Sequence, residues 1–500
     1  MTTALLPQVT ATWLKFALAI VAGILMAFSF SPFDWWPLGI GAIVLLLYAI
    51  DKATIKQVVA CHYVFALGLF SVGISWLYVS INTYGGASPA LAVVLVLLFV
   101  VFWSLTFIPQ AWLYARFIRQ WRYGMVLGFS IIWVLGEWFR GWFLTGFPWF
   151  YLGYSHLQSP LASFAPVAGV LAVSLAACLL ATSLFCLLVK RRKRYGALSL
   201  GVFLVALGVA KLEFVTPGKT IQVAAVQGNI DQHSKWQRSM VMPIANHYRQ
   251  LTEAVWGVDL VVWPEAAITV LHSDANPLLA PLRQLSQAQD TTLLTGIPDR
   301  DDQGRFLNSA VVIGSAPGQY VKQRLVPFGE YVPFESYLRG LITFFDLPMS
   351  RNVAGSPGQT PLMAGDISLS VSICYEVVYS ELVRSNAPDP GLLVTISNDT
   401  WFGRSSGPDQ HMQIASMRAL ENGRYLLRAT NNGITALVDH KGRIVNQLPR
   451  DTAAVMSVEV PIMQGLTPYH RFGQIPLLIG MGLLLAGLGL FSKQQYSLKP

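Results

Sequence analysis

Hydrophobic residues occur in long, nearly uninterrupted runs along the first two fifths of the chain, and once more near its end. Several runs are shorter than the ~20 residues that a membrane-spanning helix needs, but Trp and Tyr at their ends extend them to a suitable length. Many of the runs lack a polar face, which favours membrane-spanning helices over the buried helices of a large soluble protein. The runs cover residues 13–30, 36–50, 58–81, 90–114, 124–144, 161–189, 197–210 and 475–491.

Between about residues 211 and 471 the pattern changes to short apolar runs separated by helix-like stretches. Apolar strands that alternate with helices indicate an α/β layered domain whose sheet is buried on both faces. We therefore predict a seven-helix transmembrane domain at 1–215, an α/β domain at 216–472 and a C-terminal transmembrane helix with a short tail at 473–500. The strand-like runs are 220–226, 259–263, 291–297, 310–313, 368–373 and 392–397, and the helix-like stretches include 276–289 and 411–422.

The composition supports a membrane protein, because 53% of the 500 residues are hydrophobic and only 12% are charged. A soluble chain of this size would need far more charge to stay in solution. The net charge of +9 would also suit a nucleic-acid-binding protein. However, the basic residues lie mostly in short segments between apolar runs, which is typical of membrane topology, so we expect no nucleic-acid partner.

The positions of Lys and Arg predict the orientation of the chain in the membrane. The loops around Asp34 and at 82–86 carry neither residue, whereas alternate loops are basic. By the positive-inside rule, both termini are cytoplasmic and the segment 211–471 lies outside. The first run follows Lys15 as in a signal peptide, but no small-x-small cleavage site comes after it, so we interpret it as a retained span. The basic loops hold Lys52 and Lys56, then Arg116, Arg119 and Arg122, the block 190–194, and finally Lys493 and Lys499.

Of the four cysteines, one lies in the predicted outer domain. Cys61, Cys178 and Cys186 fall inside predicted spans, where a cysteine usually serves as a small buried hydrophobic residue. Cys374 follows the strand-like run 368–373, at the end of a strand where open α/β sheets place ligands and reactive groups. A lone thiol in an oxidising compartment is either buried and inert or free for reaction, and its spacing alone leaves both interpretations open.

Two charged residues offer partners for this thiol. Glu265 comes directly after the strand-like run 259–263 and Pro264, although a surface carboxylate in a turn would look the same. Lys322 begins a stretch that interleaves charges with aromatic residues, Gly and Pro up to Phe334, and an exposed hairpin with a solvated lysine is the alternative there.

A Cys, a Glu and a Lys together meet the needs of one kind of chemistry. A thiol with a pKa near ~8.5 is mostly protonated at neutral pH, so it needs a base or a nearby cation. A carboxylate can take the thiol proton and return it to a leaving group, while an ammonium can stabilise the thiolate and a tetrahedral oxyanion. None of the eight histidines has a comparable setting, and neither a zinc-ligand cluster nor a phosphate-cradling glycine loop appears in the sequence. We therefore expect no metal and no cofactor.

Several motifs, taken in order, resemble those of the apolipoprotein N-acyltransferase family, the membrane-bound branch of the nitrilase (carbon–nitrogen hydrolase) superfamily. The resemblance covers nearly the whole chain. It is carried by Trp263-Pro264-Glu265, by Lys322 with the segment 325–333, and by Ile373-Cys374-Tyr375-Glu376, together with residues 146–149, 153–154, 227–230, Trp236 and 398–403.

The resemblance implies an α-β-β-α sandwich carried on eight transmembrane helices in the bacterial inner membrane, with the catalytic domain in the periplasm. It implies that an acyl chain moves from a phospholipid, typically phosphatidylethanolamine, to Cys374 as a thioester. The acyl chain then moves to the α-amino group of the S-diacylglyceryl cysteine of an apolipoprotein. In this reaction Cys374 would be the nucleophile, Glu265 the base and Lys322 the oxyanion stabiliser.

The resemblance also implies supporting roles for four further residues. Glu330 and Glu376 correspond to supporting carboxylates, and Tyr375 and Trp236 correspond to residues on the substrate side. In the fifth apolar run, Glu137 and Arg140 would be costly in hydrocarbon unless paired or hydrated. They could contact a lipid headgroup, but we favour a structural ion pair.

Three other functions remain alternatives. A membrane-tethered amidase or nitrilase would use the same three residues with water as the acceptor. A transporter with an outer binding domain would usually have paired or interrupted inverted halves, which the order of seven spans, a domain and one span does not suggest. An inactive scaffold would be expected to have lost Glu265, Lys322 or Cys374, and all three are present.

Overall fold

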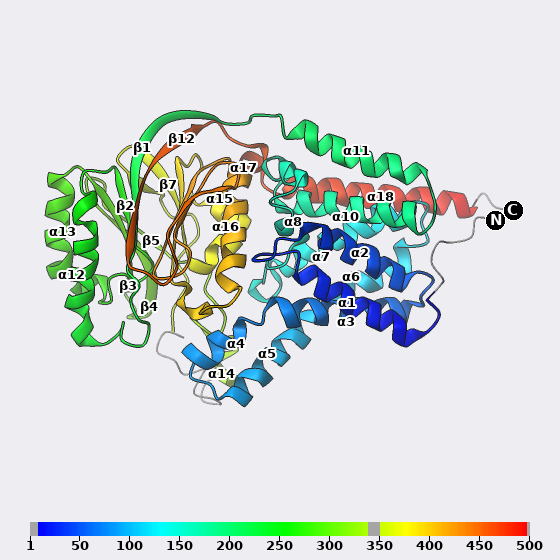
Figure 1. Ribbon diagram of the computed structural model, residues 1–500, viewed down its shortest axis with the longest axis horizontal. Helices are drawn as coiled ribbons and strands as arrows, with labels where there is room; N and C mark the ends of the chain where they lie inside the picture. Colours follow the sequence, from blue (N-terminus) through cyan, green and yellow to red (C-terminus); the bar gives the residue numbers. More distant parts are fainter. Residues whose placement is uncertain (1–8, 339–350, 498–500) are drawn as a thin grey trace. The chain divides into compact units, whose positions relative to one another are not determined.

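The computed structural model describes residues 9–338 and 351–497, and it divides the chain into two compact units (Figure 1). The first comprises residues up to Tyr78, Pro89–Glu213 and the residues from Pro468 onward; the second comprises Val79–Ser88 and Phe214–Thr467. The chain ends that we predict to be cytoplasmic, residues 1–8 and 498–500, lie outside the described residues.

The first unit is helical, and glycines allow its helices to approach closely. Helix α1 (Thr12–Ala27) packs along α3 (Ile55–Gly73), and a Cβ on Gly23 would lie 1.9 Å from the carbonyl oxygen of Phe65. A Cβ on Gly68 would lie 2.5 Å from the carbonyl oxygen of Ile20. Backbones in contact through small residues are the usual way in which helices associate in a membrane.

Among the described residues, four helical segments are long and apolar enough to cross a membrane, which supports the membrane character of the chain. Three further apolar helices are shorter, so the predicted total of about eight spans stays a prediction. The predicted run at 124–144 contains the π-helical turn η3 (Gly124–Gly128) and a helix of 12 residues, α7 (Phe129–Arg140). The four long segments are α3, Pro89–Ile118 (α5, α6 and η2), α10 (Val170–Leu188) and Ile475–Ser492 of α18 (Ile475–Ser497); the shorter ones are α1, α2 (Trp36–Ile50) and α11 (Arg194–Val209).

The charged residues of α7 do not form the ion pair that we expected. The Glu137 carboxylate accepts hydrogen bonds from the Trp133 indole (2.9 Å) and from the Leu152 backbone N–H (2.8 Å). The Arg140 guanidinium lies 4.1 Å from the ring centroid of Phe107 and donates to Gln110. Both side chains are buried, and hydrogen bonds and an aromatic face hold each of them in place, while each charge still acts on the other through space.

The second unit is built on two six-stranded sheets. Their strand orders are β12-β1-β2-β3-β4-β5 and β11-β10-β9-β8-β7-β6, and in each sheet three neighbouring strands run parallel, β1–β2–β3 and β7–β8–β9. The strands are β1 (Thr216–Gln227), β2 (Leu260–Val262), β3 (Thr292–Arg300), β4 (Phe306–Ile313), β5 (Gly318–Val321), β6 (Leu362–Ala364), β7 (Ile367–Ile373), β8 (Leu392–Ser397), β9 (Leu426–Thr430), β10 (Ala436–Val438), β11 (Ile444–Gln447) and β12 (Ala454–Gln464).

One hydrophobic core lies between the sheets and helices cover their outer faces. Val223 and Leu294 of the first sheet share a buried cluster with Val371 and Val394 of the second. Helices α12 (Val241–Thr252) and α13 (Asn276–Ala288) bury their apolar sides on the first sheet, while α15 (Ser380–Ser385) and α16 (Gly407–Asn422) contact the second (Figure 1). Strands with both faces buried explain the continuous apolar runs in the sequence. The implied α-β-β-α sandwich is confirmed.

A short segment from the N-terminal half of the chain also belongs to the second unit. It contains the π-helical turn η1 (Ser80–Tyr84), and the Ser80 hydroxyl donates to the carbonyl oxygen of Trp401 at 2.8 Å. The Tyr84 ring stacks on His233 with centroids 5.7 Å apart and meets Trp401 edge-on. In the sequence, Val79–Ser88 comes at the end of the predicted run 58–81. Its composition does not indicate which of the two units it packs with.

Candidate active site

The predicted reactive residues follow parallel strands at their carboxyl ends. Glu265 comes three residues after β2, and Cys374 comes directly after β7. Asn398 follows β8, which pairs with β7 so that Ile373 lies opposite Ile396. The carboxyl ends of parallel strands are where open α/β folds gather ligand-binding groups.

Glu265 is held in a defined orientation and is 8% exposed. Its Oε1 accepts a hydrogen bond from the Asn308 amide (2.8 Å), and its Oε2 accepts one from the Asn398 backbone N–H (3.0 Å). Gly296 on β3 makes room for this loop, since a Cβ there would lie 2.7 Å from the Cα of Glu265. The alternative of a surface carboxylate in a turn is wrong.

Lys322 is 1% exposed, so the alternative of a solvated lysine in a hairpin is also wrong. Its Nζ lies 2.9 Å from Oε1 of Glu330 and 3.5 Å from Oε1 of Glu265. Burial alone would lower the pKa of Lys322, but the negative charges of Glu330 and Glu265 outweigh burial and raise it. The site therefore keeps a permanent ammonium next to a carboxylate.

Asn308, which the sequence analysis did not single out, joins the two carboxylates. Its Nδ2 donates to Oε1 of Glu265 and to Oε1 of Glu330 (2.9 Å), while its carbonyl oxygen accepts from the Lys322 backbone N–H at 2.8 Å. Glu330 is fixed from the other side, because its Oε2 accepts from the Val326 N–H at 2.8 Å. Glu330 is thus held between Lys322, Asn308 and the Val326 N–H, and its supporting role stays a prediction.

Cys374 sits at a sharp bend between β7 and the 3-10 helix η11 (Cys374–Val378). Its φ of 53° is in the left-handed region, which is unusual for a residue with a side chain and is often found at functional sites. Burial raises the pKa of the Cys374 thiol to about 12; the charge of Glu265 adds to the rise and Lys322 opposes it. The resting thiol is therefore protonated, and its proton must leave during the attack on a substrate.

Glu376 links the strand of the cysteine to the strand of the lysine. Its Oε2 accepts from the Ile373 N–H (2.8 Å), and its Oε1 accepts from the Gln323 N–H (2.6 Å) and the Tyr320 hydroxyl (3.0 Å). Burial raises its pKa to about 7, although these donors favour the carboxylate. Glu376 therefore supports the positions of β7 and β5 relative to each other.

A buried histidine, which the sequence analysis did not single out, contacts the backbone of the proposed nucleophile. The ring of His411 places Nε2 3.2 Å from the Cys374 carbonyl oxygen and Nδ1 3.3 Å from Asp399. Arg428 lies 2.8 Å from the Asp399 carboxylate; burial would raise the pKa of Asp399, but this guanidinium holds it well below its usual range. Because burial and Arg428 lower the pKa of His411, the imidazole is neutral, and its Nε2 contacts the carbonyl oxygen of Cys374.

The predicted substrate-side residues lie next to the cluster. Lys235, which the sequence analysis did not single out, is fully buried, donates to the Glu265 carbonyl oxygen (3.2 Å) and has its pKa lowered by burial to about 8. The neighbouring Trp236 is 46% exposed. Tyr375 meets the ring of Tyr379 edge-on. The substrate roles of Trp236 and Tyr375 stay predictions.

These groups suit the addition of a thiol to a carbonyl carbon. Glu265 can accept a proton, and Lys322 supplies a fixed positive charge beside it. The motion of Glu265 and Lys322 is restricted by Asn308, Glu330 and Glu376. The site therefore needs little rearrangement as negative charge develops on the carbonyl oxygen of a substrate.

Known proteins resemble both parts of this chain. Residues 22–183 match the family model of the apolipoprotein N-acyltransferase N-terminal domain, and residues 222–465 match that of carbon–nitrogen hydrolases, which supports a nitrilase-like second unit. The apolipoprotein N-acyltransferase of Pseudomonas syringae pv. tomato is 43% identical over 493 residues, covering 96% of this chain and 97% of the relative. That of Vibrio cholerae is 38% identical, covering 93% and 95%. A solved carbon–nitrogen hydrolase from Helicobacter pylori G27 covers 49% of this chain and 90% of its own, with 16% identity and a TM-score of 0.39.

Proposed function

The chain belongs to the apolipoprotein N-acyltransferase family, and on that premise we propose the acyl donor, the intermediate and the roles of its residues. As a member of this family, the protein is a bacterial membrane acyltransferase that N-acylates lipoproteins. In our proposal the donor is a phospholipid such as phosphatidylethanolamine, and the acyl chain rests on Cys374 before it reaches the amine of the diacylated apolipoprotein. The catalytic domain faces the periplasm of the inner membrane, and both termini are cytoplasmic.

The first half-reaction forms a thioester. The Cys374 sulfur attacks an ester carbonyl of the phospholipid while Glu265 takes the thiol proton, which gives a tetrahedral oxyanion next to the Lys322 ammonium. When the oxyanion collapses, the bond to the glycerol oxygen breaks and Glu265 returns the proton to that oxygen. The lysophospholipid leaves as an alcohol, and the carboxylate of Glu265 is restored.

The second half-reaction repeats this sequence with a different nucleophile. The α-amine of the apolipoprotein attacks the thioester carbonyl, and Glu265 takes a proton from the nitrogen. A second oxyanion forms beside Lys322, the C–S bond breaks, and the proton returns to the sulfur of Cys374. The product is an amide, and both the thiol and the carboxylate are regenerated, as ping-pong transfer requires.

The observation that carries this proposal is the contact of Lys322 Nζ with Glu265 (3.5 Å) and Glu330 (2.9 Å), in a buried cluster to which the Cys374 thiol is electrostatically coupled. A charge fixed in this way can serve both oxyanions. Water could replace the amine in the second step, which would make the chain an amidase or nitrilase, but the names of its relatives favour the amine.

The test is to incubate the purified full-length protein with isotopically labelled phosphatidylethanolamine and to examine the Cys374 peptide by mass spectrometry. We expect an acyl adduct on Cys374 that disappears when a diacylated lipopeptide is added and that reappears as label on the peptide amine. Cys374→Ser should give neither adduct nor product, whereas Cys178→Ala should give both. Labelled product from Cys374→Ser, or release of free fatty acid with no acylated peptide, would contradict the proposal.

A further inference from the structure

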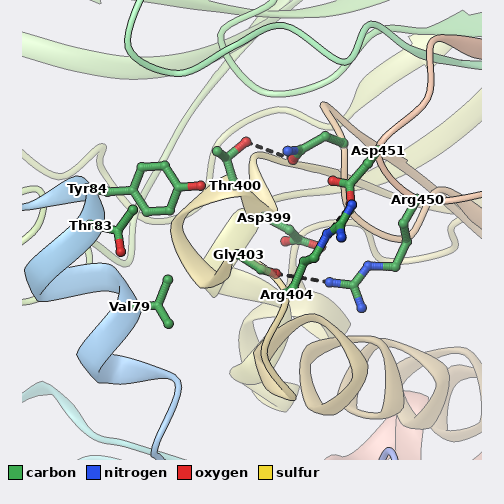
Figure 2. A pocket seen from close by; sticks show the side chains of 11 residues that line it. Val79, Thr83, Tyr84, Asp399, Thr400, Gly403, Arg404, Arg450 and Asp451 are labelled. Carbon is green, nitrogen blue, oxygen red and sulfur yellow. Dashed lines mark hydrogen bonds and ion pairs between the residues drawn. The ribbon is translucent and has the colours of Figure 1, made fainter.

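A pocket of about 360 Å³ opens in the second unit next to the loop that follows β8. Figure 2 shows Thr83 and Tyr84 of the η1 segment on one side, and Arg404, Arg450 and Asp451 on the other. This volume is about that of twelve water molecules in the liquid, at about 30 Å³ each. It suits a small polar group better than an acyl chain.

Two arginines supply positive charge to this pocket. Arg450 donates to the Gly403 carbonyl oxygen (3.0 Å) and lies 3.4 Å from Asp409, so its guanidinium is held in place. Arg404 contacts Asp451 through Nε at 3.3 Å, and its side chain is 88% exposed. An exposed ion pair of this kind contributes little, so an entering anion can take over the Arg404 guanidinium at small cost. Planar guanidinium groups match the oxygens of a phosphate.

The pocket also has an acidic part. The Asp451 carboxylate borders the pocket on the side opposite Tyr84, and the pKa of the Tyr84 phenol is raised by burial and then by the charges of Asp231 and Asp451. Asp399 lines the pocket too, but Arg428 already neutralises that carboxylate. Asp451 is therefore the carboxylate best placed to receive a cation once Arg404 turns to an anion.

The turn 398–400 connects the pocket to the catalytic cluster. The Asn398 N–H donates to Glu265 Oε2, and the Asn398 side chain accepts from the hydroxyl of Thr400, which lines the pocket. The neighbouring Asp399 reaches the Cys374 carbonyl oxygen through a single imidazole, that of His411. A group bound in the pocket is thus one turn of backbone away from the base.

We propose that this pocket binds the phosphodiester headgroup of the acyl donor, with Arg404 and Arg450 on the phosphate oxygens and Asp451 on an adjacent ammonium. This inference rests on the proposed phospholipid donor. A zwitterionic headgroup can bind both the basic and the acidic part of the pocket. A purely anionic headgroup would be repelled by the Asp451 carboxylate.

The experiment measures single-turnover acylation of Cys374 in the full-length protein by mass spectrometry. Three donors carry the same acyl chain: phosphatidylethanolamine, phosphatidylglycerol and a phosphate-free p-nitrophenyl ester. The variants are the double Arg404→Gln/Arg450→Gln and the single Asp451→Asn. Arg443→Gln, an exposed arginine in the β10–β11 turn, is the matched control.

We expect the double variant to be acylated about tenfold more slowly by both phospholipids, mainly because the partly buried Arg450 loses a charged hydrogen bond while the exposed Arg404 contributes less. The phosphate-free ester should acylate it at the normal rate. Asp451→Asn should slow phosphatidylethanolamine about tenfold and leave phosphatidylglycerol equal or faster. Arg443→Gln should match the wild type with all three donors.

Other results would overturn the inference. Equal slowing with the phosphate-free ester would mean that the arginines only support the turn 398–400. The variants could instead be acylated normally and be slow only in transfer from pre-acylated enzyme to a diacylated peptide. That result would assign the pocket to the acceptor. If soluble O-phosphorylethanolamine bound while phospholipid acylation stayed normal in the variants, the pocket would serve a free phosphate ester. Wild-type protein that accepted only the phosphate-free ester would refute the proposed donor itself.

Discussion

The protonation state of Cys374 gives a prediction that can be measured without any substrate. With a pKa of about 12 instead of the ordinary 9.0, the thiolate makes up about 10⁻⁴ of the protein at pH 8, against about 10⁻¹ for an ordinary thiol. The thiolate is the form that alkylating reagents attack, and its greater nucleophilicity at high pKa offsets part of its scarcity, so Cys374 should react roughly 50-fold more slowly than a free cysteine at that pH.

The contributions to this pKa predict opposite effects of two substitutions. Glu265 raises the pKa of the thiol, so Glu265→Gln should lower it and should speed alkylation about three- to fourfold for each unit of pKa, while enzymatic acylation is lost. Lys322 lowers the pKa of the thiol, so Lys322→Met should slow alkylation. Glu459→Gln, a change on the exposed side of β12, should have no effect.

The assay follows iodoacetamide adducts on the Cys374 peptide between pH 6 and pH 10.5, with glutathione as the reference. We expect the rate to rise through pH 10 with no plateau. Steric hindrance would lower the whole curve but would not move its inflection, so the shape of the profile separates access from ionisation. A plateau below pH 8, or slower alkylation in Glu265→Gln, would refute the neutral resting thiol and would indicate a stable thiolate–Lys322 pair.

Three further predictions concern the lysine, the bridging amide and the topology. Lys322→Ala should slow both half-reactions by ~10²–10³ in single-turnover measurements. Lys322→Arg should be equally slow, because a planar guanidinium donates in different directions from an ammonium. Unchanged deacylation in Lys322→Ala would rule out the shared oxyanion role. Asn308→Leu should lower the free energy of unfolding by about 2 kcal/mol in denaturant titrations and should slow turnover, since it removes the donor shared by Glu265 and Glu330. A cysteine at the exposed Ser88 should react with an impermeant thiol reagent in intact spheroplasts and one at the exposed Lys193 should not; the reverse labelling would contradict the orientation.

The sequence was informative about the residues that follow buried strands. Strands β2 and β7 are buried almost throughout; β2 appears as a continuous apolar run, whereas β7 alternates serine with apolar residues. In both cases the residues at the carboxyl end can be located by counting along the chain. Glu265 and Cys374 were found in this way. Lys322 needed its motif as well, because β5 has four residues with mixed burial, and its pattern also fitted an exposed hairpin.

Asn308 and His411 could not be found in this way, because their roles depend on pairing between distant segments. Asn308 lies within β4, and its position relative to Glu265 follows from the pairing of β3 with β4, in which Pro298 is opposite Asn308. His411 lies on α16, a helix that is buried all round, and it meets Asp399 and Arg428 from two other elements. A helix without an exposed face has no amphipathic pattern to indicate which of its residues face a site.

In the proposed mechanism, the raised pKa of Cys374 has consequences for the second half-reaction. A thiol of high pKa gives a thiolate that leaves slowly, so its thioester resists attack by a weak nucleophile such as water. The amine step must then return a proton to the sulfur as the C–S bond breaks, and Glu265 holds that proton after taking it from the amine. A base that is 8% exposed and bonded to Asn308 and Asn398 is well suited to keep it from bulk water for that short time. The burial that makes the thiol a poor nucleophile at rest thus also protects the acyl-enzyme until the acceptor arrives.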